Sequence, residues 1–124
     1  MRALIVEDSP TWRVVLAGYF EEHPLQWTIS VASRLDEAIR FLNGATVDLI
    51  VLDLLLPDTI GSDSVRMLQH FVETTTTPIL VLSGLDDPTT QQAVRARGVK
   101  ALLSKRTTDV DLFLATIDRI LSGP

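Results

Sequence analysis

Short apolar runs that recur between segments of helical periodicity constrain the fold more than any other feature of this sequence. A run that is apolar at every position, such as 3–6 or 79–82, predicts a strand buried on both faces, which is typical of a parallel sheet covered by helices. The run at 27–31 alternates more than the others, so we expect it at an edge of the sheet. The five runs are 3–6, 27–31, 47–52, 79–82 and 99–103. Five strand–helix units predict an α/β fold with an open, doubly wound parallel sheet.

Capping residues and prolines predict where the first two helices begin and end. Ser9-Pro10 combines an N-cap with a first-turn proline and opens a helix that stops before Pro24. Ser33 with Asp36 forms a capping-box-like start for the second helix, and Gly44 is expected just beyond its C-terminus.

The last three helices differ in their apolar content. The third precedes the threonine tract 74–77 and Pro78, which together end it. The fourth begins at 86–88 and ends at Gly98, and its few apolar residues predict weak anchoring and movement in a switch. The fifth begins near Thr108 and has a full apolar stripe. The stripe of the third helix consists of Val65, Leu68, Phe71 and Val72.

Composition restricts the class of protein. The 124 residues fit one compact domain, 1–124, and a hydrophobic fraction of 46% argues against a disordered regulatory tail. The net charge of −5 and the lack of a Lys/Arg run disfavour direct binding of nucleic acid by this domain. With no cysteine, disulfides and thiolate chemistry are excluded. No apolar run suits a signal peptide or a membrane span, so we expect a cytoplasmic domain without membrane contact.

Polar residues that could bind a metal or take part in a reaction fall at the C-terminal ends of the expected strands. They are Glu7 and Asp8 after the first strand, Asp53 after the third, Ser83 after the fourth and Lys105 after the fifth. The C-terminal ends of parallel strands meet at one edge of a doubly wound sheet, so these side chains should share one crevice. Each close pair of carboxylates repels by about 4 kcal/mol at an effective dielectric near 20, and a divalent cation such as Mg²⁺ offsets that repulsion.

With these residues, the sequence resembles the receiver domains of two-component response regulators over essentially its whole length. Asp53 is followed by Pro57 and Gly61, four and eight residues later, as in the loop pattern of that family. Ser83 with the small Gly84 resembles the family's hydroxyl-plus-small pair, and the lysine after the fifth strand matches as well. The resemblance implies a flavodoxin-like (β/α)5 fold with the strand order 2-1-3-4-5.

The resemblance also implies a function for the acidic residues. Asp53 would be the phosphoacceptor, receiving a phosphoryl group from a histidine kinase or a histidine phosphotransfer protein. Asp8, Asp53 and the backbone carbonyl of Leu55 would hold Mg²⁺, and Glu7 would contribute to the metal site through a metal-bound water. The metal would neutralise charge on the transferring phosphoryl oxygens.

Lys105 and Ser83 would contact the phosphoryl oxygens in the same scheme, with the backbone N–H groups of Leu54 and Gly84 as further donors. Phosphorylation would switch the helix 4–strand 5–helix 5 face, which would control an unknown output domain or effector and is a candidate homodimer surface. Such a domain catalyses only its own phosphorylation and dephosphorylation, so we do not class it as an enzyme. Whether it stands alone or belongs to a longer regulator stays open.

Three other functions can be weighed against this hypothesis. A pseudo-receiver would keep the fold and bind partners without phosphorylation, but the chain has the full set of site residues. A phosphatase with an aspartate nucleophile needs a second acid two residues on, where this chain has Leu55. A flavin-binding electron carrier needs a hydroxyl-rich phosphate loop after the first strand, where Glu7 and Asp8 would repel a phosphate.

The chain also departs from the family pattern. Many receivers have an aromatic residue three positions before the lysine, where this chain has Leu102, and a proline after it, where this chain has Arg106. Leu55 and Leu85, two positions after Asp53 and Ser83, offer no side chain that orients a hydrolytic water. We therefore expect a long-lived phosphorylated state.

Four residues keep open interpretations at this point. Arg106 is an alternative to Lys105 as the cation of the site. Trp12 either rims the pocket or packs in the core. His23, beside a proline, and His70, in an amphipathic helix, are expected to have surface or boundary roles.

Overall fold

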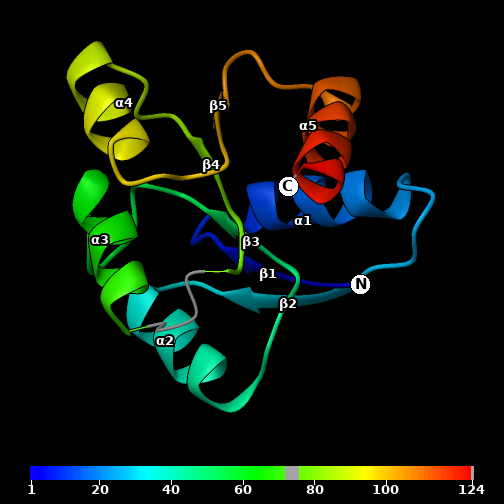
Figure 1. Cartoon of the computed structure of the whole chain (residues 1–124), viewed down its shortest axis with the longest axis horizontal. Helices are drawn as coiled ribbons and strands as arrows, with labels where there is room; N and C mark the ends of the chain where they lie inside the picture. Colours follow the sequence, from blue (N-terminus) through cyan, green and yellow to red (C-terminus); the bar gives the residue numbers. More distant parts are fainter. Residues whose placement is uncertain (72–75, 124) are drawn as a thin grey trace.

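Five parallel strands form one sheet in the order β2-β1-β3-β4-β5, which confirms the predicted α/β architecture (Figure 1). The computed structural model describes residues 1–71 and 76–123, without the side chain of residue 71. The strands are β1 (Arg2–Val6), β2 (Thr28–Ala32), β3 (Leu49–Leu52), β4 (Ile79–Ser83) and β5 (Ala101–Ser104). The helices are α1 (Pro10–Glu21), α2 (Leu35–Gly44), α3 (Ser62–Phe71), α4 (Pro88–Arg95) and α5 (Val110–Ser122).

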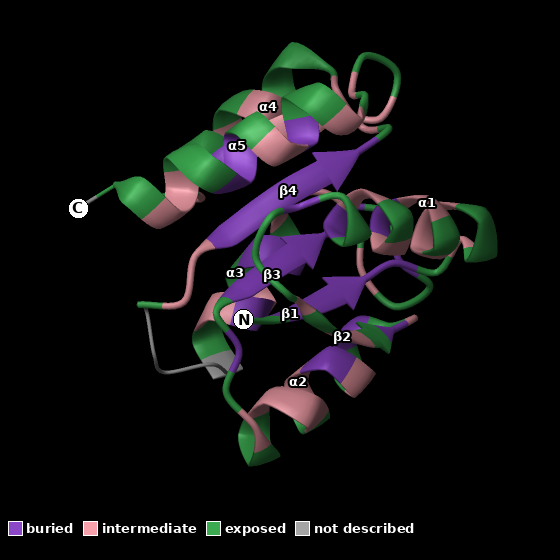
Figure 2. Ribbon diagram, turned by 90° about the vertical axis from the view of Figure 1, so that its right-hand side faces the viewer, coloured by how far each residue is buried: buried purple, intermediate pink, exposed green. Residues whose placement is uncertain are grey.

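The helices cover both faces of the sheet, with α1 and α5 on one face and α2, α3 and α4 on the other (Figure 1). Successive strand residues therefore enter different cores: Ala3 and Ile5 join the α1–α5 core, whereas Leu4 and Val6 join the α2–α3–α4 core. Figure 2 shows that β1, β3 and β4 are buried along most of their length, while β2 at the edge is largely not. The greater alternation at 27–31 correctly indicated this edge position.

A group of aromatic rings packs within the α1–α5 core. Phe20 lies 5.3 Å from Phe113 with the rings at 86°, and 5.0 Å from Trp27, centroid to centroid. His23 is buried beside them, and its Nε2 lies 2.8 Å from the Asp118 carboxylate of α5. His23 lies just beyond the end of α1, at a boundary as expected, but its side chain is buried rather than at the surface and joins the α1–β2 turn to α5. His70 is exposed, as predicted.

The start of α2 differs from the sequence prediction. The N-cap is Arg34, which makes no side-chain capping bond, and Ser33 does not cap the helix. Instead, the Asp58 carboxylate of the β3–α3 loop accepts the N–H groups of Leu35 at 2.9 Å and Asp36 at 3.0 Å. A tertiary contact thus replaces the local capping box, and the orphan amides of the first turn still find an acceptor.

Several other boundaries shift by a few residues. Gly44 lies inside α2, and the extended Ala45 follows as its C-cap. Helix α4 ends at Arg95, and Gly98 lies in the following turn with a φ of 78°, a conformation that favours glycine. The expected third-helix stripe at Val72 and the first residues of the threonine tract lie outside the described residues. Within the described part of the chain, no helix is both long enough and apolar enough to span a membrane.

Candidate functional site

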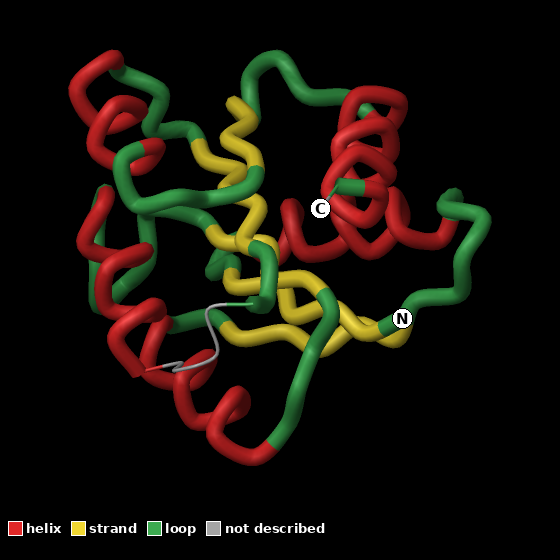
Figure 3. Tube along the Cα trace, in the orientation of Figure 1, coloured by secondary structure: helices red, strands yellow, loops and turns green. Residues whose placement is uncertain are grey.

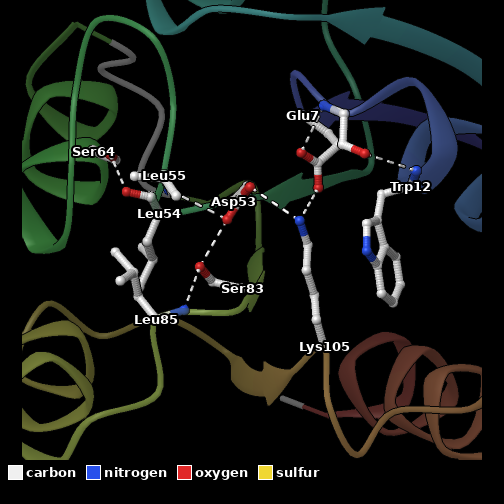
Figure 4. A network of polar contacts seen from close by, with 10 residues as sticks. Glu7, Trp12, Asp53, Leu54, Leu55, Ser64, Ser83, Leu85 and Lys105 are labelled. Carbon is white, nitrogen blue, oxygen red and sulfur yellow. Dashed lines mark hydrogen bonds and ion pairs between the residues drawn. The ribbon is translucent and has the colours of Figure 1, made fainter.

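The C-terminal ends of four strands bring four polar side chains together at one edge of the sheet (Figure 4). The hydrogen-bond ladder continues one residue beyond the strands: Asp53 donates its N–H to Val6 at 3.0 Å, and Lys105 donates to Ser83 at 3.0 Å. These bonds fix the backbone at the site. The side chains of Glu7, Asp53 and Ser83 are buried, and only 15% of the Lys105 side chain is exposed.

The Asp53 carboxylate lies at the centre of this cluster. Its Oδ1 accepts hydrogen bonds from the Ser83 hydroxyl at 2.7 Å and from the Leu55 N–H at 3.2 Å. Its Oδ2 accepts a bond from the Lys105 ammonium at 3.1 Å. The Ser83 oxygen in turn accepts the Leu85 N–H at 3.2 Å. Both oxygens of a buried carboxylate are thereby satisfied, as a buried charge requires.

Glu7 shares the ammonium with Asp53. Its Oε1 lies 2.5 Å from Lys105 Nζ, and its Oε2 accepts the Ser9 N–H at 3.1 Å. Burial raises the pKa of Glu7 and the charge of Asp53 raises it further, although the bond from Lys105 opposes both. Desolvation acts to lower the pKa of Lys105, but its bond to Glu7 and the charge of Asp53 outweigh that effect and raise it. The ammonium is therefore held in its charged form.

Three carboxylates at the site suit a divalent metal ion. Oxygens of Glu7, Asp8 and Asp53 lie within 4.8 Å of one another, with Asp8 exposed and the other two buried. Among the residues that the structure describes, Lys105 is the basic side chain that forms ion pairs with this group, so three carboxyl groups share one ammonium and a divalent cation would offset the repulsion between them. Carboxylate oxygens are the donors that Mg²⁺ prefers, and a partly exposed site lets the ion keep water ligands. The donor set fits the metal that the sequence analysis expected.

The loop from β3 to α3 shapes one wall of the site. Gly61 has a φ of 67° and donates its N–H to the Leu54 carbonyl at 2.7 Å, while Leu56 donates to Thr59 at 3.0 Å. A short antiparallel bridge joins Leu55 to Ile60 in the same loop. Glycine at this position is required because the turn needs a positive φ. The backbone of Leu55, whose carbonyl was expected to hold the metal, is thus fixed next to Asp53.

The neighbouring basic residues Lys105 and Arg106 bind different carboxylates. Lys105 points into the acidic cluster, whereas Arg106 Nε donates to the Asp86 carboxylate at 2.8 Å and lies outside it. Ser104 Oγ donates to the same carboxylate at 2.9 Å, so Asp86 links the β4–α4 and β5–α5 loops. These bonds hold the pKa of Asp86 below its usual value, the Arg106 bond most of all.

Sequence reasoning missed this link, although the pairing of Ser83 with Ser104 in neighbouring strands would have placed the two loops side by side. The structure also places Trp12, whose position the sequence left open, and Leu102, which stands where many receivers have an aromatic residue. Trp12 lies beside Lys105 at the pocket and also packs against the α1–α5 core (Figure 4). Leu102 is partly buried and packs against the α2–α3–α4 core, so no ring stands at that position.

Comparisons with known proteins agree on one family. The family model of the response regulator receiver domain matches residues 3–117. The protein PilH of Pseudomonas aeruginosa is 27% identical over 122 residues, which cover 98% of each chain. A protein-glutamate methylesterase/protein-glutamine glutaminase of Nitrosospira multiformis is 32% identical over 106 residues, or 82% of this chain, but the match spans only 29% of that relative.

Solved structures show the same fold. The receiver domain of a signal transduction histidine kinase from Syntrophus aciditrophicus has a TM-score of 0.81 and 31% identity, covering 98% of this chain and 90% of that one. A CheY-like receiver domain protein from Methanospirillum hungatei has a TM-score of 0.84 with 18% identity, covering 97% and 92%, and supports the fold alone. The family match over nearly the whole sequence and the five-stranded architecture show that this chain belongs to the response regulator receiver domain family, the signalling module of two-component systems.

Proposed function

We propose that Asp53 is the phosphoacceptor of this receiver domain and that a histidine kinase or a histidine phosphotransfer protein supplies the phosphoryl group, with Mg²⁺ at the acidic cluster. The observation that carries the proposal is the surroundings of the Asp53 carboxylate. One oxygen faces a hydroxyl at 2.7 Å, the other faces an ammonium at 3.1 Å, and two further carboxylates lie within 4.8 Å. Phosphoryl transfer requires this combination of nucleophile, cations and donors.

Each residue of the site has a separate role in the transfer of the phosphoryl group. A carboxylate oxygen of Asp53 forms a bond to phosphorus while the phosphorus–nitrogen bond to the donor's imidazole breaks. Lys105 and Ser83, which both contact that carboxylate already, then donate to phosphoryl oxygens. Glu7, Asp8, Asp53 and the Leu55 carbonyl are the groups that would hold Mg²⁺, which neutralises charge on the transferring group when bound.

The switch follows from these changes of partner. Ser83 ends β4 and Lys105 follows β5, so their movement toward a phosphoryl group acts on the loops that lead to α4 and α5. We propose that the α4–β5–α5 face carries this change to an output domain or effector, and that a homodimer through this face is one form the response takes. The domain itself is a signalling module rather than a classical enzyme.

The deciding experiment is the intact mass of the protein after incubation with a small acyl phosphate, with and without Mg²⁺. We expect a single Mg²⁺-dependent phosphoryl adduct in the wild type and in Asp111→Asn, a matched change at an exposed aspartate of α5, but none in Asp53→Asn. If the wild type takes no phosphoryl group under any condition, the alternative holds, namely a pseudo-receiver that only binds partners.

The lifetime of the adduct tests a finer part of the proposal. Leu55 is 51% exposed and Leu85 packs against the α2–α3–α4 core, so neither offers a group that orients water toward the phosphorus. We expect Leu55→Asn and Leu85→Glu to lose the phosphoryl group faster than the wild type, while Leu112→Asn, an exposed site on α5, does not. Equal rates of loss in all four proteins would contradict the proposal.

A further inference from the structure

We propose that Trp12 is a positioning residue for Lys105. Its indole forms one wall of a cradle, made by Trp12, Glu7 and Asp53, that holds the ammonium at the phosphoacceptor. The inference deepens the proposed function and rests on it. It starts from one distance: Lys105 Nζ lies 5.2 Å from the centroid of the Trp12 ring, within the range in which a cation is attracted to the face of an indole (Figure 4).

The cradle surrounds the ammonium with groups of different kinds. Glu7 Oε1 lies 2.5 Å from Nζ and Asp53 Oδ2 lies 3.1 Å from it, while the indole supplies the remaining wall. Because only 15% of the Lys105 side chain is exposed, water screens these attractions weakly. A ring contributes attraction without carrying a charge of its own, so it adds no further carboxylate to a site that already has three.

One short stretch of sequence builds two walls of the cradle. Ser9 donates its N–H to Glu7 Oε2 at 3.1 Å, and its hydroxyl accepts the Trp12 N–H at 3.3 Å as the N-cap of α1. Pro10 begins the helix at its first position. The capping geometry therefore fixes the Glu7 carboxylate relative to the backbone of Trp12, and both side chains contact the same lysine.

The Lys105 side chain is long, and the indole restricts it in addition to the two ion pairs. The residue lies in the turn after β5, and four rotatable bonds separate its backbone from the ammonium. The neighbouring cation is turned away, since Arg106 binds Asp86, and the core position three residues before Lys105 is the aliphatic Leu102. The indole therefore limits where the lysine side chain can go.

The contact of Lys105 with the Trp12 ring and its contacts with Glu7 and Asp53 change differently when the phosphoryl group is transferred. A phosphoryl oxygen competes with Glu7 and Asp53 for the ammonium because all three are hydrogen-bond acceptors. The Trp12 ring face does not take a hydrogen bond away from the phosphoryl group, so it stays against the lysine before and after transfer. Trp12 thus orients Lys105 toward the phosphoryl group, while a phosphoryl oxygen replaces a carboxylate oxygen as a partner of the ammonium.

Kinetics with the full chain test the proposal. At saturating Mg²⁺, we expect Trp12→Leu to slow phosphorylation by a small acyl phosphate by about tenfold, and Trp12→Phe, which keeps a ring face, to stay within about threefold of the wild type. The same Trp12→Leu change in a Lys105→Met background should alter the residual rate very little, because the group that the indole positions is gone. An equal loss in both backgrounds, or no loss in either, would overturn the proposal.

A second measurement needs no phosphorylation. In Trp27→Phe the remaining indole is Trp12, and we expect its fluorescence to change as Mg²⁺ binds and draws the carboxylates away from Lys105. In Trp27→Phe with Lys105→Met that change should be largely lost. If the wild type takes no phosphoryl group, the proposed function fails, and this Mg²⁺ titration alone tests whether Trp12 positions Lys105. A fluorescence change that persists in the Lys105→Met variant would refute the positioning role of Trp12. The titration does not depend on whether Trp12→Leu folds.

Discussion

Helices α4 and α5 flank the same end of the sheet but are held by different means. Three residues of α5 are buried, namely Phe113, Thr116 and Ile117, whereas Val94 is the buried residue of α4. Helix α5 also belongs to the aromatic core and is tied to the α1–β2 turn through the His23–Asp118 contact. Figure 3 draws the segment from β5 to α5 and the segment before α4 as loops; the first carries Lys105, and the second carries Leu85, whose N–H binds Ser83.

Helix α4 has few buried side chains and is held largely by polar contacts at its two ends. Asp87 caps the helix by accepting the Thr90 N–H at 3.0 Å, and Gln69 of α3 donates to the Arg97 carbonyl at 2.8 Å in the turn that follows. Such contacts stabilise a segment less than a buried ring does, and segments with few buried contacts open first. The comparison predicts that the α1–α5 core is the fixed frame of the domain and that, within the α4–β5–α5 face, α4 moves more than α5.

The largest expected effect is a loss of stability when a buried ring is removed from the α1–α5 core. Phe113→Ala removes a fully buried ring that contacts Phe20, so we expect the free energy of unfolding to fall by about 3–5 kcal/mol. Val94→Ala on α4 should cost about 2 kcal/mol, because it removes only two methyl groups. Leu112→Ala, at the exposed neighbour of Phe113, should change stability by less than about 0.5 kcal/mol. Urea unfolding measures all three, and an equal cost for Phe113 and Val94 would contradict the comparison.

The tie between the α1–β2 turn and α5 gives the next largest effect. His23 Nδ1 accepts the Trp27 Nε1–H at 3.1 Å and the Leu25 N–H at 3.1 Å, so its Nε2 carries the proton and donates to Asp118. His23→Phe keeps an aromatic ring, although a larger one, but leaves these donors without an acceptor, and we expect a loss of about 1–3 kcal/mol in urea unfolding.

A double variant provides the control for this tie. Trp27→Phe removes the indole donor, so its cost and the cost of His23→Phe should not add. If the two losses add in full, the hydrogen bond between Trp27 and His23 does not contribute to the stability that urea unfolding measures.

On the opposite face, the cap of α2 gives a smaller effect that depends on pH. Desolvation acts to raise the pKa of Asp58, but the N–H groups of Leu35 and Asp36 outweigh it and lower that pKa below its usual value. A lowered pKa stabilises the fold above the unfolded-state pKa, and this stabilisation disappears as pH falls through the folded-state pKa. Asp58→Ala should therefore cost about 1 kcal/mol at neutral pH and almost nothing in strong acid.

Urea unfolding at a series of pH values checks the Asp58 prediction. Asp58→Asn serves as the control, because an amide keeps one acceptor oxygen and does not titrate. Its loss should be smaller and nearly independent of pH in this range. A cost of Asp58→Ala that stays the same in acid would show that the carboxylate acts through packing rather than through its charge.

The contrast between the two faces also explains what the sequence could and could not predict. Buried parallel strands have a local signature, and the residue at each strand end enters the crevice because the topology leaves it no other place. The cap of α2 has no such signature, since its acceptor Asp58 lies 22 residues beyond the Asp36 amide. The partner of His23 is 95 residues away, and only the packing of α5 on α1 brings Asp118 to it. Local patterns predict elements, whereas contacts across the fold decide how their ends are held.

The smallest expected effect is the one that links the comparison to signalling. If α4 is the responsive side, phosphorylation of Asp53 should change amide hydrogen exchange most within residues 84–106, by several-fold and by less than about 1.4 kcal/mol of local opening free energy. The amides of α1 and α2 should change little, because neither helix follows Ser83 or Lys105 in the chain. Exchange followed by mass spectrometry, with the wild type in Mg²⁺ but without a phosphoryl donor as the control, separates this response from an effect of Mg²⁺ alone. Changes confined to α1 and α2 would mean that the weakly buried helix is not the one that moves, and that low burial and switching are separate properties in this domain.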